Sequence, residues 1–320
     1  MKLITAFLKL IRWPNLVMIA VTQVLFYFSL VRPLYSFYSG SQVVNSAFTN
    51  LHLVLLIISS LLIAAAGNII NDYFDLNIDE INKPEKKIID KLIKRRWAIL
   101  MHIVFSLTGI LLGFYVDMHT PVFWLGFSNC LCVLLLFGYS ITLKKKLLAG
   151  NILVSLLTAW VILVCFFCYY RSFSCTGCEP FQWDASIRRF IRISFLYAGF
   201  AFVISLIREV VKDMEDMEGD KRYGCRTIPI AWGIPAGKVF VAVWLVVLIG
   251  MIGIVQFYVL QFGWYWSAVY CIVLIITPLV WVLWKLYQAQ VPKDYHQLST
   301  AIKFVMMAGL LSMIFFKIYS

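Results

Sequence analysis

The stretch AAAGNIINDYFDLNID, at residues 64–79, continues an apolar run and ends as a polar segment with three aspartates. The stretch EVVKDMEDMEGD, at residues 209–220, follows another apolar run in the same way. Each stretch holds four polar residues at separations of 4, 3 and 4: Asn68, Asp72, Asp75 and Asp79, and then Glu209, Asp213, Asp216 and Asp220. Because a helix has 3.6 residues per turn, each set is predicted to line one helix face. We call them the first and the second acidic stripe.

The composition is that of a membrane protein. Apolar residues make up 62% of the 320 residues and charged residues 14%, and the mean hydropathy is +0.86. Soluble domains carry about a quarter charged residues, so soluble enzymes, disordered chains and disulfide-framework secreted domains are excluded. The net charge of +12 would suggest a nucleic-acid partner in a soluble protein, but here it must be interpreted relative to the apolar runs. We predict an all-α multi-pass membrane protein with a single domain over residues 1–320.

Runs of about 20 apolar residues can cross the roughly 30 Å hydrocarbon core of a bilayer as helices. Nine such runs lie between charged segments: 15–31, 53–70, 98–116, 122–143, 147–170, 193–207, 239–260, 265–284 and 304–319. We therefore predict nine transmembrane helices in one bundle. No small-residue cleavage site closes the first run, so it is expected to stay in the protein.

Basic residues indicate the orientation of these spans. The N-terminus and the even-numbered connections hold 22 of the 28 basic residues, and the odd-numbered connections and the C-terminus hold 6. Basic residues favour the cytoplasmic side of a cell membrane, so the N-terminus is predicted to be cytoplasmic and the C-terminus to lie outside. Twelve of the 16 acidic residues, in and around the two stripes, then lie at cytoplasmic helix ends.

Carboxylates one helical turn apart repel each other by about 1 kcal/mol in water and by about 4 kcal/mol in a partly buried setting. Divalent cations offset this repulsion, and magnesium is typically held by one or two carboxylates together with substrate phosphates. We therefore predict a magnesium-diphosphate site between the two stripes. One alternative is that the acidic residues are merely solvated turns beside the membrane. An EF-hand fits less well, because Glu80 stands where that loop needs glycine and Lys86 where it needs glutamate.

The residues around both stripes resemble the motifs of the UbiA-type intramembrane prenyltransferase family. Residues 71–79 match its NDxxDxxxD pattern, and residues 208–229 are similar to its second motif. Within the family, the second motif is most similar to that of enzymes that make digeranylgeranylglyceryl phosphate, with related forms in chlorophyll-synthase-like and quinone-pathway members. The sequence departs from the family at residues 86–90, which read Lys-Lys-Ile-Ile-Asp where a run like Arg-Pro-Ile-Pro-Ser-Gly is common.

The resemblance implies nine helices around a central cavity, with the Asp motifs on the cytoplasmic side. It also implies Mg2+-dependent transfer of a polyprenyl group, expected to be geranylgeranyl, from its diphosphate to an acceptor. The expected acceptor is a prenylated glycerol phosphate of lipid biosynthesis; the alternative is an aromatic quinone or pigment precursor, such as 4-hydroxybenzoate, naphthoate, homogentisate or a chlorophyllide-like compound. Membrane lipids are expected around the chain, and neither a nucleic acid nor a protein partner is expected.

A cation-coupled membrane transporter is the rival from another class, because ionisable residues in membrane segments also mark transport paths. The acidic residues, however, lie at the ends of the spans, and the spans carry almost no charge near the bilayer midplane. Transporters bind their substrates and coupling ions near the midplane. The charge pattern therefore favours the enzyme.

The motifs assign roles to individual residues. The expected catalytic carboxylates are Asp72, Asp75, Asp79, Asp213, Asp216 and Asp220. The expected magnesium ligands are Asn68, Asn71, Asp72, Asp75, Asp213 and Asp216. The expected diphosphate contacts are Lys144, Lys145, Arg208 and Lys212, although the lysines would also serve as an ordinary cytoplasmic anchor. Weaker candidates for substrate contact are Arg12, Asn15, Tyr139 and Asn151.

Four cysteines, Cys165, Cys168, Cys175 and Cys178, form two CxxC pairs. In a cytosolic protein this spacing would suggest zinc. Here the first pair ends a predicted span and the second lies in a predicted outside loop. Free thiols are the default expectation, and a disulfide within the loop and a zinc site are the alternatives.

Overall fold

The structure is a computed structural model that describes residues 2–37, 43–82, 88–176 and 180–319. Its elements, in chain order, are α1 (Lys2–Leu10), α2 (Trp13–Phe26), η1 (Tyr27–Val31), α3 (Arg32–Phe37), β1 (Val43–Ser46), α4 (Asn50–Phe74), α5 (Leu76–Asn82), α6 (Arg95–His119), α7 (Leu125–Ile141), η3 (Leu143–Lys145), α8 (Ala149–Ser172), β2 (Phe173–Thr176), α9 (Pro180–Glu215), α10 (Met217–Arg222), α11 (Ile228–Ala231), α12 (Ile234–Leu260), α13 (Tyr265–Cys271), η4 (Ile272–Ile276), α14 (Thr277–Gln288), α15 (Pro292–Leu311) and α16 (Ile314–Ile318).

The chain forms two compact units. The first comprises Met1–Val24, Leu34–Lys144 and Val161–Ile191. The second comprises Leu25–Pro33, Lys145–Trp160 and Arg192–Ser320. The first acidic stripe lies in the first unit and the second acidic stripe in the second unit, so each unit is described by itself.

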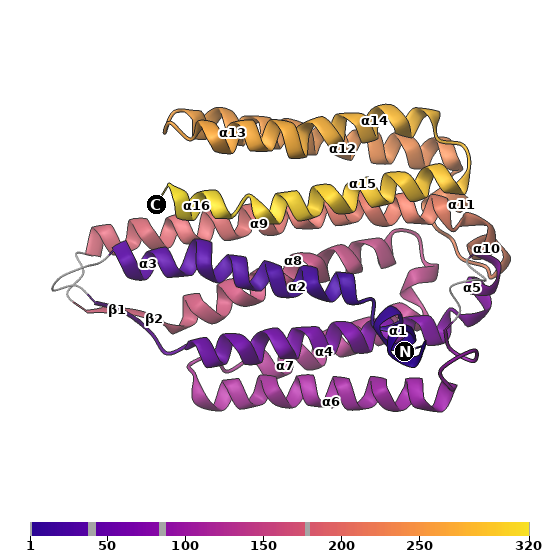
Figure 1. Cartoon of the computed structure of the whole chain (residues 1–320), viewed down its shortest axis with the longest axis horizontal. Coiled ribbons are helices and arrows are strands. Elements are labelled where there is room, and N and C mark those ends of the chain that lie inside the picture. The colour runs from indigo at the N-terminus through magenta and orange to yellow at the C-terminus, as the bar shows by residue number, and fades with distance from the viewer. Residues whose placement is uncertain (1, 38–42, 83–87, 177–179, 320) are drawn as a thin grey trace. The chain divides into compact units, whose positions relative to one another are not determined.

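In the first unit, α4, α6 and α7 lie side by side (Figure 1). The Ser59 hydroxyl of α4 donates to the Gly109 carbonyl of α6 at 2.8 Å, and Asn129 Nδ2 of α7 donates to Ser59 Oγ at 2.8 Å. Gly113 of α6 lets α7 approach closely, since a Cβ there would lie 3.0 Å from the Gly126 Cα. Small residues and interhelical hydrogen bonds are the usual means of helix association in lipid. These contacts hold α4, which carries Asn68 and Asp72 of the first acidic stripe and ends at Asp75.

In the second unit, a hydrophobic core joins α9, α12, α14 and α15. Ile207 of α9, Leu245 of α12, Leu279 of α14 and Ile302 of α15 are all fully buried in it. α9 and α15 lie beside each other and run in opposite directions (Figure 1). This packing fixes the rotation of α9 and therefore the direction in which its charged residues point.

Among the described residues, eight helices are long and apolar enough to cross a bilayer. They run over Trp13–Leu34, Asn50–Phe74, Arg95–His119, Ala149–Ser172, Ala185–Glu215, Ile234–Leu260, Tyr265–Gln288 and Pro292–Ile318. Eight of the nine predicted spans coincide with these helices. The other one, 122–143, coincides with α7, which is apolar but shorter (Leu125–Ile141).

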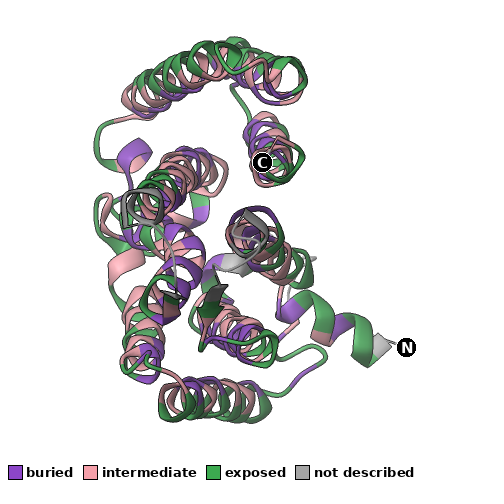
Figure 2. Cartoon of the chain, turned by 90° about the vertical axis from the view of Figure 1, so that its left-hand side faces the viewer, coloured by how far each residue is buried: buried purple, intermediate pink, exposed green. Residues whose placement is uncertain are grey.

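Many apolar side chains remain outside the cores of both units. Buried and exposed residues occupy different faces of the same helices (Figure 2). On α6, for example, Leu100, Val104, Leu107 and Leu111 are exposed at helical spacing. An apolar face of this length is compatible with lipid as the surrounding solvent.

One short β-ladder was not expected from the sequence. In the first unit, β1 pairs with β2 in antiparallel fashion, with Val43 opposite Thr176 and Ser46 opposite Phe173. Cys165 and Cys168 are buried free thiols on α8. The side chain of Cys175 and the whole of Cys178 lie outside the described residues, so the disulfide and zinc alternatives are untested.

Candidate functional site

The first acidic stripe surrounds the end of α4. Asn68, Asn71 and Asp72 lie on the last two turns of the helix. Asp75 ends the helix, with φ −90° and ψ 1°, and its N–H donates to the Asn71 carbonyl at 2.9 Å. Asp79 follows on α5, and its side chain lies outside the described part of the structure. The stripe was expected on one continuous helix, but the helix is interrupted at Asp75.

The second acidic stripe has the same interruption. Glu209 and Asp213 lie on α9, and Asp216 stands between α9 and α10 with φ −96° and ψ 9°. Asp220 lies on α10. The third member of each stripe thus occupies the same sparsely populated backbone region, where many active-site residues are found. Aspartate is a poor helix former because its side chain competes for nearby backbone groups, which accounts for a helix end at these positions.

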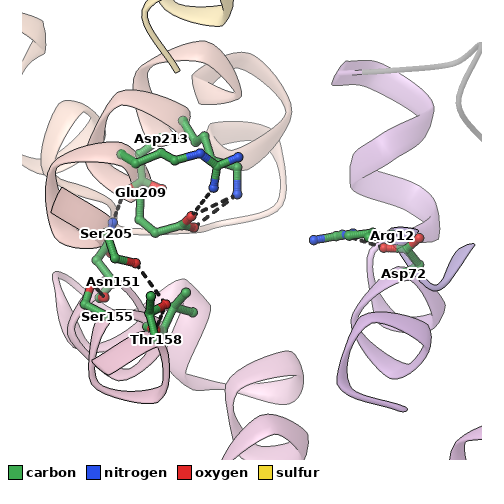
Figure 3. A network of polar contacts seen from close by, with 11 residues as sticks. Arg12, Asp72, Asn151, Ser155, Thr158, Ser205, Glu209 and Asp213 are labelled. Carbon is green, nitrogen blue, oxygen red and sulfur yellow. Dashed lines mark hydrogen bonds and ion pairs between the residues drawn. The ribbon is translucent and has the colours of Figure 1, made fainter. Parts of the chain in front are cut away.

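Two cations contact the carboxylates of the first stripe. Arg12, between α1 and α2, donates from Nη2 to Asp72 Oδ1 at 2.6 Å (Figure 3). Lys144 of η3 donates from Nζ to Asp75 Oδ1. The Asp72 carboxylate raises the pKa of the Arg12 guanidinium above its ordinary value. Tyr139 of α7 interacts electrostatically with Arg12. Lys144 and Arg12, which the sequence assigned to the substrate, therefore lie against the acidic stripe itself.

The two asparagines near the end of α4, Asn68 and Asn71, differ in their contacts. Asn68 Nδ2 donates to the Ile11 carbonyl at 3.0 Å, which ties α4 to the segment that carries Arg12. Asn71 Oδ1 is buried and has no hydrogen-bond partner among the described residues. A buried carbonyl oxygen without a partner is costly, and it is the type of oxygen that a divalent cation accepts as a ligand. Asn15 contributes its backbone N–H, which donates to the Arg12 carbonyl at 2.8 Å.

A polar network surrounds the second stripe (Figure 3). Asn151 of α8 donates from Nδ2 to Asp213 Oδ2 at 2.8 Å. Glu209 accepts from Arg208 Nη1 at 3.1 Å and from Lys212 Nζ at 3.1 Å. Asp213 also interacts electrostatically with Glu209 and Asp220. Asn151, a weak candidate from the sequence, is thus the residue that orients one of the central carboxylates.

Two further lysines, Lys145 and Lys303, belong to the second unit. The Lys145 side chain is exposed, and the Lys145 carbonyl accepts from the Arg226 N–H at 2.9 Å. Lys303 of α15, which the sequence analysis did not single out, interacts electrostatically with Arg208 and Lys212. No local sequence signal marks Lys303, because its place depends on how α9 and α15 pack.

The residues fit a magnesium ion by the chemistry of their oxygens. Each unit offers carboxylates together with an asparagine side chain, and such hard oxygen ligands suit magnesium. Within the described residues of the structure, no group of three or more His, Cys, Asp or Glu side chains is close enough to hold a metal ion. Magnesium typically keeps waters and substrate phosphates as ligands beside one or two carboxylates.

Comparison with known proteins gives a consistent result. The sequence profile of the UbiA prenyltransferase family matches residues 16–308. The chain is 29% identical over 249 residues to digeranylgeranylglyceryl phosphate synthase of Methanosphaera stadtmanae, an alignment that covers 77% of this chain and 81% of the relative. It is 35% identical over 177 residues to the protein of the same name from Methanothermobacter thermautotrophicus, covering 55% of this chain and 54% of that relative. The second alignment thus spans about half the length of the relative.

Solved structures share the fold at low sequence identity. A structure described as digeranylgeranylglyceryl phosphate synthase in membranes superposes with a TM-score of 0.60 at 23% identity, covering 98% of both chains. A UbiA homologue from Archaeoglobus fulgidus, solved with GPP and Mg2+, superposes with a TM-score of 0.56 at 16% identity, covering 97% of this chain and 99% of that one.

Proposed function

Because this chain belongs to the UbiA prenyltransferase family, we propose that it is an integral membrane enzyme that transfers a prenyl group from its diphosphate to an acceptor, with Mg2+ as cofactor. The prenyl group proposed is geranylgeranyl, and the acceptor a geranylgeranylated glycerol phosphate. Both follow from the names of the relatives from Methanosphaera and Methanothermobacter. The magnesium requirement is supported by the homologue from Archaeoglobus fulgidus that was solved with GPP and Mg2+.

One observation carries the proposal: the two acidic stripes share both their spacing and their backbone geometry. Asp75 and Asp216, the third members, each end a helix in nearly the same conformation. Asp72 and Asp213, the second members, are each held by a hydrogen bond from another element, from Arg12 and Asn151 respectively. Two solvated turns would have no reason to share these features. We infer that both stripes serve the same reaction.

The chemistry requires charge stabilisation more than covalent participation. The bond between C1 of the allylic chain and the diphosphate oxygen breaks, and its electron pair leaves with the diphosphate. The acceptor hydroxyl attacks the resulting allylic cation and loses its proton, which gives an ether. Magnesium ions, when bound, neutralise charge that develops on the diphosphate. We propose that Asp72, Asp75, Asp213 and Asp216 hold the metal, with Asn71 Oδ1 as a neutral ligand.

The cations near the stripes bind phosphate oxygens of the substrates in this proposal. Lys144 contacts Asp75 and Arg12 contacts Asp72, which supports a role for both cations at the proposed diphosphate site. A cation aimed at a leaving oxygen stabilises the departure of that group. Lys145, Arg208 and Lys212 are proposed to contact phosphate oxygens as well. Asn68, Asp79 and Asp220 complete the stripes as outer members.

We further propose the topology that the sequence predicts. α7 crosses the cell membrane as a ninth helix, the N-terminus is cytoplasmic, the C-terminus lies outside, and the chain acts as one catalytic domain. The 17 residues of α7 are at the lower end of the length that spans a bilayer. Its partners α4 and α6 are each 25 residues long, and packing against them supports a crossing.

The test is a turnover assay with two acceptors. Purified protein receives radiolabelled geranylgeranyl diphosphate and Mg2+, together with geranylgeranylglyceryl phosphate in one reaction and 4-hydroxybenzoate in another. We expect lipid product only with the glycerol phosphate acceptor, and none from an Asp213→Asn variant that folds normally. Product formed only with the aromatic acid would show that the proposed identity of the acceptor is wrong. No product with any acceptor would overturn the proposed function.

A further inference from the structure

A cluster of three cations lies on α9 and α15 in the second unit. Arg208 and Lys212 are four residues apart on α9, so their side chains share one face of that helix. Lys303 of α15 interacts electrostatically with both. We call Arg208, Lys212 and Lys303 the basic cluster. Cations within apolar spans are costly and mark functional sites.

The register between α9 and α15 accounts for the position of Lys303. His296 Nδ1 of α15 lies 2.9 Å from Glu215 Oε1 of α9, which fixes the two helices against each other at that point. Arg208 precedes Glu215 by seven residues and Lys303 follows His296 by seven. The helices run in opposite directions (Figure 1), so both steps of about 10 Å go the same way. Lys303 therefore lies at the level of Arg208, about two turns from the end of α9 and about three turns from the start of α15.

The Nε of Arg208 is a hydrogen-bond donor whose acceptor is missing among the described residues. The Nη1 of Arg208 donates to Glu209, but its Nε is buried and has no hydrogen-bond partner among the described residues. A buried donor without a partner is energetically costly. Guanidinium groups bind phosphates through two parallel N–H groups, so a phosphate at Nε would satisfy this donor. Glu209 accepts from Lys212 as well and so holds both cations of α9 in place.

The basic cluster and Asp213 lie on different sides of α9, and Glu209 of the second acidic stripe pairs with Arg208 and Lys212. Asp213 is hydrogen-bonded to Asn151 of α8, whereas Arg208 and Lys212 interact electrostatically with Lys303 of α15. Lys212 and Asp213 are neighbours in sequence, which places their side chains about 100° apart around the helix. A diphosphate bound through metal belongs with the carboxylates. The phosphate of an acceptor would be a separate anionic group, and it would satisfy the buried Nε of Arg208.

We propose that Arg208, Lys212 and Lys303 bind the phosphate group of a phosphorylated prenyl acceptor. The inference rests on the proposed function and deepens it: the acceptor is a phosphate monoester, and the basic cluster selects it over acceptors without that group. Lys303 is an additional binding residue for this reaction. Arg208 and Lys212 contact the acceptor phosphate rather than the donor diphosphate.

The test compares two acceptors that differ only in the phosphate, geranylgeranylglyceryl phosphate and geranylgeranylglycerol. The measured quantity is the ratio of kcat/KM for the first to kcat/KM for the second. Loss of a charged hydrogen bond costs about tenfold or more in binding, so Lys303→Gln is expected to lower this ratio about tenfold. This decrease should arise from a higher KM for the phosphorylated acceptor, and the KM for the prenyl diphosphate should be unchanged.

Two further variants separate binding from folding. Lys303→Arg keeps the charge and is expected to keep most of the ratio. Lys293→Gln removes an exposed lysine from the first turn of the same helix and is expected to leave the ratio unchanged. As an independent probe, glycerol 1-phosphate should compete with the acceptor in the wild-type protein and in Lys303→Arg, but weakly in Lys303→Gln.

The outcomes distinguish this inference from the proposed function. If the wild-type protein uses the phosphorylated acceptor and Lys303→Gln keeps the wild-type ratio, the inference is wrong and the proposed function stands. If Lys303→Gln raises only the KM for the prenyl diphosphate, the basic cluster binds the donor substrate and the inference is also wrong. If the wild-type protein transfers only to an acceptor without phosphate, both fail.

Discussion

At the end of α4, Asp72 and Asp75 are paired with cations that are distant in sequence. Arg12 precedes Asp72 by 60 residues and Lys144 follows Asp75 by 69. The Asp72 side chain is 20% exposed and the Arg12 side chain 38%, so water screens this pair only in part. Removal of one partner from such a pair leaves a costly charge. A metal ion bound at these carboxylates would take over the charge neutralisation and leave both cations for the diphosphate.

Asp72→Asn is expected to lower kcat at least about a hundredfold, as removal of one group that stabilises transition-state charge does in other enzymes. Steady-state kinetics with saturating Mg2+ measure the loss. Asp90→Asn is the matched control, because Asp90 is a loop carboxylate at φ 70°, a conformation that asparagine tolerates. Near-normal turnover by the Asp72→Asn variant would show that Asp72 is not part of the catalytic site.

Asn151→Ala is expected to act through Asp213, since it removes the 2.8 Å hydrogen bond that orients this carboxylate. We expect kcat to fall about tenfold, because positioning partners of metal ligands typically matter by 10–100-fold. The Mg2+ concentration that gives half-maximal rate should rise as well. Thr158→Val, which changes another polar residue of α8, serves as the control. An unchanged magnesium dependence in Asn151→Ala would contradict the positioning role.

The sequence could indicate the role of a residue only where the role is reflected in the spacing of polar residues along one helix. The 4-3-4 separations identified Asp72, Asp75, Asp213 and Asp216 as candidate metal ligands. The pairing of Arg12 with Asp72 and the approach of Lys303 to Arg208 depend on tertiary packing. No pattern within one helix could show either.

At the scale of elements, the close packing of α6 against α7 depends on glycine. A Cβ at Gly113 would lie 2.5 Å from Asn129 Nδ2 and 3.0 Å from the Gly126 Cα, so a neighbouring helix would have to move. Overpacking of this kind costs about 1–3 kcal/mol. Gly113→Ala is therefore expected to lower the melting temperature of the purified protein in detergent.

Gly138→Ala is the matched control for that experiment. Gly138 also lies in a helix of the first unit, and a Cβ there would meet nothing within 4 Å. Alanine is a better helix former than glycine by about 1 kcal/mol, so this variant should melt at the wild-type temperature or above it. Equal destabilisation by the two substitutions would contradict the packing argument.

Elements were predicted well where hydrophobicity alone defines them. Eight predicted spans coincide with long apolar helices. The helix ends at Asp75 and Asp216 were not predicted, because a periodic pattern continues through them. The β1–β2 ladder was also missed, since each strand has only four residues and is defined by a partner more than 100 residues away.

At the scale of the whole molecule, the number of crossings decides on which side each connection lies. With nine crossings the N-terminus and Gln290 lie on the same side of the membrane, whereas a chain in which α7 does not cross places them on opposite sides. We expect Gln290→Cys to react with a membrane-impermeant thiol reagent only after the cells are opened, like a cysteine tag at the N-terminus.

Gln261→Cys is the control for this labelling, because the loop after α12 is predicted to lie outside. It should react in intact cells. Labelling of the unmodified protein gives the background from the native cysteines. Reaction of Gln290→Cys in intact cells, with the N-terminal tag protected, would show that α7 does not cross and would contradict the nine-helix topology.

The central claim is that the two acidic stripes support one magnesium-dependent prenyl transfer. The most direct measurement is the rate of product formation from radiolabelled geranylgeranyl diphosphate and geranylgeranylglyceryl phosphate while Mg2+ is removed with EDTA and then restored. We predict that turnover falls to background in EDTA and returns when Mg2+ is added in excess. Turnover that persists at the full rate in EDTA would contradict the claim.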